Sequence, residues 1–183
     1  MMRIILTLVC ISLVTGALAQ GEDNSLKDVP AKERMVFGGG FGLGFSNTQD
    51  YVMVSPSIGY MLTRKLMAGV NLSYQYTKYK FTIPSISVNA YGFGPFARFM
   101  IYDNLFLHTE YEYLNYQFPG ASRSFDSFLA GGGFIQPLGS NTALYFLALY
   151  NFAYQTPKPG EFTPYGSPLV IRAGISLGGF GFN

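Results

Sequence analysis

Along most of the chain, apolar residues recur at every second position, as expected for strands with one apolar face. The pattern is clearest over residues 66–77, where Leu66, Val70 and Leu72 lie on one face and Asn71 and Ser73 lie on the other. Residues 51–62 alternate in the same way, with apolar residues at most even positions. Strands of this length exceed the ~5–6 residues usual in soluble sheets and match the ~9–11 tilted residues that cross a bilayer.

The alternation continues to the end of the chain and is interrupted at regular intervals by turn residues. It predicts eight strands, at residues 35–46, 51–62, 66–78, 88–101, 105–118, 125–137, 143–155 and 168–182. Short turns are expected at 63–65, 102–104 and 138–142, and longer connections at 78–87, 119–124 and 156–167. Short turns at one end and longer loops at the other are typical of outer-membrane barrels. The predicted fold is therefore all-β, an eight-stranded antiparallel up-and-down transmembrane β-barrel with short periplasmic turns and longer extracellular loops.

The composition supports a lipid-facing surface. Only 12% of the residues are charged and 49% are hydrophobic, whereas soluble domains carry about 25% charged residues. Aromatic residues cluster near both strand ends, among them Tyr116 and Phe125 near the longer loops and Tyr60 near the short turns. Two such clusters predict aromatic girdles at the two membrane interfaces. A soluble barrel with an aromatic core is the alternative, and the continuous apolar face favours lipid.

The first residues differ from the rest of the chain. Residues 1–19 have a basic start, an apolar centre and the small-residue ending Ala17-Leu18-Ala19, which together predict a secretory signal peptide. A lipoprotein acylated at Cys10 is disfavoured, because bulky Val9 precedes that cysteine and the apolar region continues past it. Residues 20–34 are rich in charge, and we expect them to form a flexible periplasmic arm. Residues 35–183 form the expected outer-membrane β-barrel domain.

Glycine is concentrated in the first predicted strand, "MVFGGGFGLGF". The spacing G-x-G-x-x-G of a dinucleotide site fails in this stretch, and a relaxed form at Gly92, Gly94 and Ala97 lacks the helix that such a site requires. Alternation instead places Phe37 and Phe41 against lipid and the even-numbered glycines inside. We expect these glycines to make room for the long side chains of two arginines, Arg98 and Arg172.

The pieces "SPSIGYMLTRKLMAGVNLSYQY" and "YGFGPFARFMIYDNLFLHTEYEY", with the signal peptide and the aromatic C-terminus, resemble the small eight-stranded outer-membrane barrels. They are similar to the porin-superfamily "outer membrane protein β-barrel domain" group of Gram-negative bacteria. The resemblance covers residues 35–183 and implies the outer membrane, with lipid, lipopolysaccharide and the barrel-insertion machinery as partners. One departure is that Asn183 follows Phe182 at the end, where this group has an aromatic residue. A bulge at Gly178-Gly179 would bring Phe182 into register with the apolar face.

Few charged residues lie within the predicted strands, and alternation points all of them into the lumen. Arginine facing lipid near the midplane would cost about 2–4 kcal/mol, which favours this placement. Arg98 and Glu110 flank the turn at 102–104 at nearly equal distance and are placed to pair across adjacent strands. The sequence thus predicts a lumen ion-pair cluster that acts either as a structural plug or as a conducting or ligand site. Its members are Arg98, Glu110, Glu112 and Arg172, with His108 beside them, and Asp126 is the other charged residue within the predicted strands.

Catalysis is not expected. His108 is the only histidine, and no serine stands at a natural partner spacing on its strand. Glu110 and Glu112 lie two residues apart, about 6.5–7 Å by backbone rise, a separation that glycosidases also use, but a narrow lumen admits no polysaccharide. The mature chain has no cysteine, so no transition-metal site and no cofactor are expected.

An eight-stranded barrel is just wide enough for side chains to fill its interior. The sequence therefore predicts an integral outer-membrane β-barrel protein, monomeric, with a largely filled lumen and a structural or surface-interaction role. A narrow channel or carrier for small solutes and a soluble lipocalin-like ligand binder are the alternatives. The net charge of +2 is too small to suggest nucleic acid, and no nucleic-acid partner is expected. The sequence does not decide which residues of strand 125–137 point inward, because neither the odd nor the even positions of this strand are consistently apolar.

Overall fold

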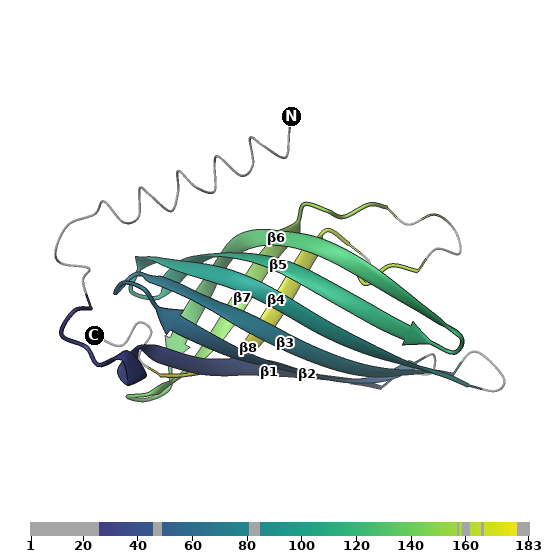
Figure 1. Cartoon of the computed structure of the whole chain (residues 1–183), viewed down its shortest axis with the longest axis horizontal. Helices are drawn as coiled ribbons and strands as arrows, with labels where there is room; N and C mark the ends of the chain where they lie inside the picture. Colours follow the sequence, from purple (N-terminus) through teal and green to yellow (C-terminus); the bar gives the residue numbers. More distant parts are fainter. Residues whose placement is uncertain are drawn as a thin grey trace.

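The computed structural model describes residues 26–45, 49–80, 85–156, 158, 162–165 and 167–178. Its eight antiparallel strands form a closed up-and-down barrel in which each strand pairs with its neighbours in sequence and β1 pairs with β8. Figure 1 shows the short turns and the N-terminal segment at one end, and the long connection between β7 and β8 toward the other. The predicted all-β fold and its strand order are confirmed.

The observed strands follow the predicted ones closely over most of the chain. Their bounds are β1 Met35–Phe45, β2 Gln49–Met61, β3 Leu66–Tyr79, β4 Ile86–Tyr102, β5 Leu105–Phe118, β6 Ala121–Pro137, β7 Thr142–Asn151 and β8 Leu169–Leu177. Two expectations about the strand ends were wrong. β7 stops four residues before the predicted position 155, and the longer loop expected at 119–124 is a turn of two residues between β5 and β6.

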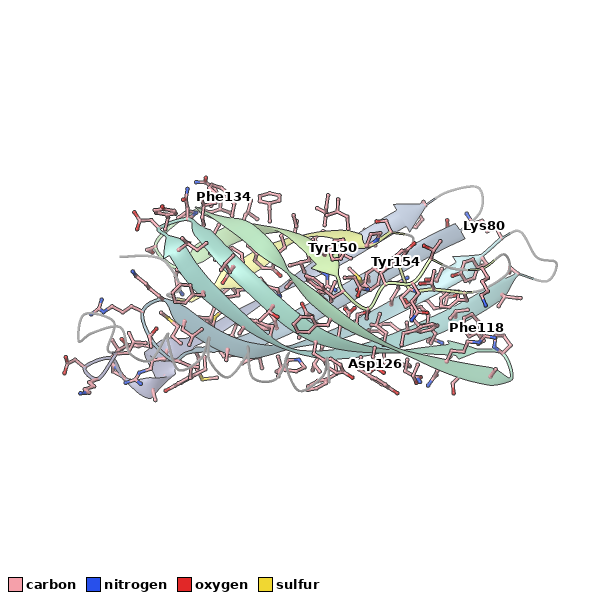
Figure 2. All side chains as sticks on the ribbon, turned by 90° about the horizontal axis from the view of Figure 1, so that it is seen from above. Lys80, Phe118, Asp126, Phe134, Tyr150 and Tyr154 are labelled. Carbon is pink, nitrogen blue, oxygen red and sulfur yellow. The ribbon has the colours of Figure 1, made fainter. Side chains whose placement is uncertain are left out.

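Successive side chains along each strand point alternately into the lumen and toward the outer surface. Met67 on β3 is 1% exposed, whereas its neighbours Leu72 and Val70 on the other parity are 53% and 36% exposed. The open question about β6 is answered in the same way, because Leu129 and Ile135 are buried while Asp126 is exposed. The odd positions of β6 therefore point inward. Figure 2 shows Phe134 at one end of the barrel and Lys80 and Phe118 at the other.

The described part of the N-terminal arm, residues 26–34, packs against the barrel. Leu26 is 7% exposed and belongs to the apolar core. The Arg34 guanidinium donates to the carbonyl oxygens of Val29 and Leu26 at 2.9 and 2.5 Å, and a 3₁₀ turn at Ala31–Arg34 leads into β1. The buried leucine and the satisfied carbonyls hold this segment against the barrel; residues 1–25 lie outside the described part.

Gly38, Gly39 and Gly40 of β1 lie at the seam where the barrel closes, and no arginine is among the nearest atoms that a Cβ at any of these three positions would meet. A Cβ at Gly38 would lie 2.8 Å from the carbonyl oxygen of Ile175, and one at Gly40 would lie 2.9 Å from that of Ala173. Gly39 has φ +154, where L side chains are strained. The glycines thus allow the β1 and β8 backbones to approach each other closely.

The C-terminal end of β8 bears on the predicted bulge. Gly178 follows the strand with φ +115, a conformation that suits glycine. Residues 179–183, including Phe182 and Asn183, lie outside the described residues. Among the residues that the structure describes, no helix has the length and apolar content to cross a membrane.

Candidate functional site

The lumen is divided along its length into parts of different chemistry. The end near the short turns is filled by an apolar core that includes Met67, Phe106 and Ile135. Buried and half-buried polar and charged side chains follow in the middle, from β3, β4, β5, β8 and the connection between β7 and β8. We call these the lumen network, and it consists of Asn71, Arg98, His108, Glu110, Glu112, Tyr165 and Arg172.

Glu110 on β5 is the centre of the lumen network. It is 2% exposed and receives hydrogen bonds from Asn71 Nδ2 at 3.0 Å and from Arg172 Nη1 at 3.2 and 3.0 Å. His108 Nε2 lies 3.1 Å from its Oε2 atom. A Cβ at Gly94 on the neighbouring strand would lie 2.8 Å from Oε1, so glycine there leaves space for the carboxylate. Three side chains therefore stabilise a carboxylate that burial alone would penalise.

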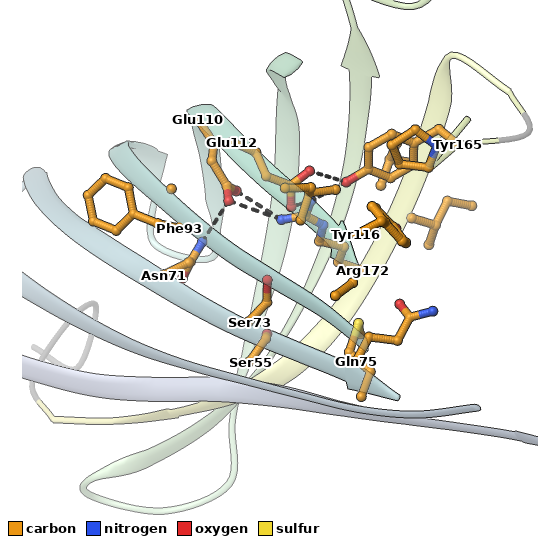
Figure 3. Close-up of a pocket in the computed structure, with 17 residues that line it drawn as sticks. Ser55, Asn71, Ser73, Gln75, Phe93, Glu110, Glu112, Tyr116, Tyr165 and Arg172 are labelled. Carbon is orange, nitrogen blue, oxygen red and sulfur yellow. Dashed lines mark hydrogen bonds and ion pairs between the residues drawn. The ribbon is translucent and has the colours of Figure 1, made fainter. Parts of the chain in front are cut away.

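Arg172 on β8 connects the strands on opposite sides of the lumen (Figure 3). Besides Glu110, it donates through Nη2 to Glu112 Oε1 at 2.8 Å and to the Tyr165 hydroxyl at 2.9 Å. The Tyr165 hydroxyl in turn donates to the other oxygen of Glu112. Charge-assisted hydrogen bonds of this kind are roughly twice as strong as neutral ones. Arg172 thereby ties β5, β8 and the connection between β7 and β8 together.

Arg98 and His108 extend the lumen network toward the apolar core. Arg98 Nε donates to His108 Nδ1 at 3.1 Å, and the guanidinium carbon lies 4.6 Å from the centroid of the Tyr145 ring. The Phe96 and Phe106 rings are at 5.0 and 5.4 Å, so aromatic faces surround the cation. Because Nδ1 accepts from Arg98, the histidine is neutral and its Nε2–H donates to Glu110. The lumen network therefore holds two cations and two carboxylates, and its charges cancel.

The structure brings all five predicted cluster residues together: Arg98, His108, Glu110, Glu112 and Arg172. The expected pairing of Arg98 with Glu110 was wrong in detail, since Arg98 lies opposite His108 in the register and donates to it, while Phe96 lies opposite Glu110.

Asp126 was also placed wrongly, because it lies on the outward parity of β6. Its carboxylate is exposed and accepts a hydrogen bond from the hydroxyl of Tyr111, another outward-facing residue. The phenol hydroxyl gives this charge a partner on the outer surface.

Three further residues of the site were not predicted. Asn71 lies on the polar face of its predicted strand, and alternation gives its direction but not its partner across the lumen. Tyr165 lies in a connection without periodicity, so no pattern marks it. Gly94 is one of many glycines. Burial, with Glu112 acting in the same direction, raises the pKa of the Tyr165 phenol above its ordinary value, although Arg172 partly opposes this.

A pocket of about 220 Å³ lies on the side of the lumen network away from the short turns (Figure 3). Its floor is formed by Glu110, Glu112 and Arg172. One wall is polar and consists of Ser55 from β2 with Asn71, Ser73 and Gln75 from β3; the other is largely apolar and includes Ala90, Leu114, Tyr116 and Val170.

Aromatic side chains fill the lumen beyond the pocket. Phe162 packs on Tyr116, Phe118 and Phe125, with ring centroids 4.8, 5.0 and 5.8 Å away. Tyr116 is 8% exposed and has the inward parity of β5, the same parity as Glu112. Tyr116 and Phe125, expected in an interfacial girdle, instead belong to an interior aromatic cluster.

The chain was compared with known proteins at the level of families, sequences and structures. No protein-family model matches it, and no curated protein and no solved structure matches it either. The eight-stranded antiparallel closed barrel is compatible with a small β-barrel protein.

Proposed function

We propose that the protein is an integral outer-membrane β-barrel whose lumen is closed by the lumen network and whose role is structural or in surface interaction. The observation that carries this proposal is the chain of hydrogen bonds from Arg98 through Glu110 to Tyr165. It joins β4, β5 and β8 across the interior, where a pore would need an open path. The outer membrane is the location, and lipid and lipopolysaccharide are the surroundings.

The outer surface supports the membrane location. Large apolar side chains are exposed on the outward parity of every strand except β6, where Phe128 and Phe134 are partly buried. In water such a continuous apolar surface would be an aggregation hazard, whereas in lipid it is favourable. The exposed set on the first three strands alone includes Phe37, Phe41, Leu43, Phe45, Val52, Val54, Ile58, Val70, Leu72, Tyr74 and Tyr76.

The state of His108 supports a role without catalysis. Its ring is 2% exposed, and both ring nitrogens are engaged, Nδ1 by Arg98 and Nε2 by Glu110. A general base must reach the proton that it removes from a substrate. We therefore assign His108 to the packing of the network, and no cofactor is needed for this role.

The membrane location is tested by fractionation after expression in a Gram-negative host. We expect the protein in the outer-membrane fraction after a sodium carbonate wash, with slower migration on denaturing gels once it is boiled. Release by carbonate would overturn the membrane proposal and favour the soluble lipocalin-like binder.

The closed lumen is tested by conductance in planar bilayers. We expect no current steps for the wild type, and steps for the triple variant Glu110→Ser, Glu112→Ser and Arg172→Ser, which removes the ion pairs between β5 and β8. The matched control carries Arg123→Ser on the exposed part of β6, and it should be silent. Steps in the wild type would show that the narrow channel is the correct alternative.

A further inference from the structure

The barrel is closed unevenly between β1 and β8. The register joins Phe37, Gly38 and Gly39 to Leu177, Ser176 and Ile175, and among the described residues no further pair joins these two strands. On their other sides the same strands are paired along nearly their whole length, β1 with β2 and β8 with β7. Figure 1 shows β1 and β8 diverging at a steep angle. The two backbones are still close at Gly40, where a Cβ would lie 2.9 Å from the carbonyl oxygen of Ala173. The seam between 41–45 of β1 and 169–172 of β8 is unpaired.

The residues that flank this unpaired seam are among the most exposed apolar side chains of the chain. Phe41 and Phe45 on β1 are 74% and 73% exposed, and Ile171 and Leu169 on β8 are 75% and 58% exposed. Outward residues on strands that are paired on both sides are less exposed, for example Val54 at 46% and Leu72 at 53%. The seam therefore has an apolar rim on both sides.

The pocket lies behind this seam. Its lining includes Met53 and Ser55 of β2 on one side and Val170, Ile171 and Arg172 of β8 on the other, and no residue of β1 is among the described residues that line it. In the register, Ser55 and Met53 are the partners of Gly40 and Gly42. β1, which lies between β2 and β8, therefore has glycine at the positions where a larger side chain would fill the pocket. On the β8 side, the unpaired strand lines this pocket at Val170, Ile171 and Arg172. Unpaired backbone at membrane depth is tolerated where it lines a polar cavity.

The chemistry of the pocket restricts its ligand. A charged head group would have to displace a partner in a network whose two cations and two carboxylates already cancel. Ser55, Ser73 and Gln75 instead offer groups that both donate and accept hydrogen bonds, which suits hydroxyls. The opposite wall, with Leu114, Tyr116 and Val170, suits an aliphatic chain. The volume of about 220 Å³ is far above the ~10–15 Å³ that one water requires.

We propose that the pocket binds a single-chain amphiphile with an uncharged, hydroxyl-bearing head, which enters from the lipid through the unpaired seam between β1 and β8. The head lies on the polar wall above Arg172, and the chain lies along the apolar wall or through the seam against Phe41 and Ile171. This proposal rests on the membrane location proposed above.

The proposal is tested by photolabelling in nanodiscs of phosphatidylcholine, with a monoacylglycerol that carries a diazirine in its acyl chain. We expect labelled peptides to include Leu114 or Val170, which face inward, besides residues of the outer surface. The variant Ser55→Phe fills the pocket and should lower inward labelling at least fivefold. The matched control Val54→Phe adds the same ring on the lipid side of the same strand and should leave inward labelling unchanged.

Three outcomes would overturn the proposal. Inward residues that are never labelled above background, or labelling that Ser55→Phe does not change, would show that the pocket is not the site. Equal inward labelling by a diazirine phosphatidylcholine would show that the head group is not selected. If Ser55→Phe does not fold, as judged by its gel migration, Ala90→Leu fills the opposite wall and takes its place.

The seam itself is tested by disulfide formation. Continuing the register of Gly39 and Ile175 would place Leu43 opposite Ile171, so the pair Leu43→Cys and Ile171→Cys reports whether the strands pair there. We expect no disulfide at this pair and ready oxidation at the control pair Phe37→Cys and Leu177→Cys, which is opposite in the register. A disulfide that forms equally fast at both pairs would refute the lateral entry, whereas failure of the membrane location would appear separately in the carbonate wash.

Discussion

Replacing Arg172 by methionine should be among the most damaging single changes in this barrel. Methionine keeps the length and apolar stem of the side chain but removes its charge and all its donors. Arg172 makes three hydrogen bonds of 2.8–3.2 Å to Glu110 and Glu112. Without it, two carboxylates, whose side chains are 1% and 9% exposed, share the lumen with no adjacent arginine to pair with them.

The size of the effect follows from the burial of the partners. Removing one member of a buried ion pair costs about 3–5 kcal/mol. Because the side chain of Arg172 is itself 25% exposed, water replaces part of its contribution, and we expect a loss near the lower bound, about 3 kcal/mol. With a urea m-value of about 2 kcal/mol/M, the unfolding midpoint should fall by about 1.5 M.

The assay is reversible urea unfolding of the protein in lipid vesicles, followed by circular dichroism of the strands. Arg123→Met on exposed β6 removes an arginine in the same way and should stay within about 0.5 kcal/mol of the wild type. Adding Glu110→Gln and Glu112→Gln to Arg172→Met should restore most of the loss, since neutral amides are less costly to bury than charges. An Arg172→Met protein as stable as the Arg123→Met control would refute the reasoning.

Three other changes test separate parts of the fold. Gly39→Ala forces a side chain onto φ +154 with a carbonyl oxygen at 2.6 Å, so it should cost about 1–3 kcal/mol in urea unfolding; Gly139→Ala, which meets nothing within 4 Å, should be neutral. Leu26→Ala should cost about 2 kcal/mol by losing a core side chain, and equal stability would show that the arm does not contribute to the core. Because the raised pKa of Tyr165 favours its neutral form in the folded state, its contribution is present below the unfolded pKa of about 10 and is lost at higher pH. Tyr165→Phe should therefore lose less stability than the wild type above pH 10, and parallel curves would contradict this.

The sequence predicts the strands well because each strand carries its own signal. Alternation places Met67 inside and Leu72 outside without knowledge of any other strand, and the same rule orients Arg98, Glu110 and Arg172. Errors appear where that local signal is weak or misleading. The run Gly131–Gly133 has no side chains to alternate, which left β6 without a parity and Asp126 on the wrong face. Phe152 and Tyr154 continue the apolar pattern of β7 although the strand has ended at Asn151.

Partners across the lumen are a different problem. Which inward residues meet depends on the stagger of the strands around the whole barrel, and this stagger is a property of closure. Counting from the turn at 102–104 therefore paired Arg98 with Glu110, while the observed register, shifted by an irregularity between Met100 and Tyr102, places His108 opposite Arg98. Tyr165 was missed because a connection has no period, yet it donates to Glu112 as directly as any strand residue.

The unequal lengths of the strands explain how the far half of the lumen is filled. β7 and β8 have ten and nine residues, whereas β4 and β6 have seventeen, so the last two strands are too short to cover the far half of the longer ones. The connection between β7 and β8 covers part of that half, because Phe162 packs on Tyr116 and Tyr165 reaches Glu112. The remaining side is the one where β1 carries glycines and where the seam is unpaired. A short β8 therefore accounts for the inward position of Tyr165. It does not account for the seam, because β8 already extends to Leu169, which falls opposite Phe45 at the end of β1 when the register of Gly39 and Ile175 is continued. Lengthening β8 at its start should therefore displace Tyr165 and leave the seam as it is.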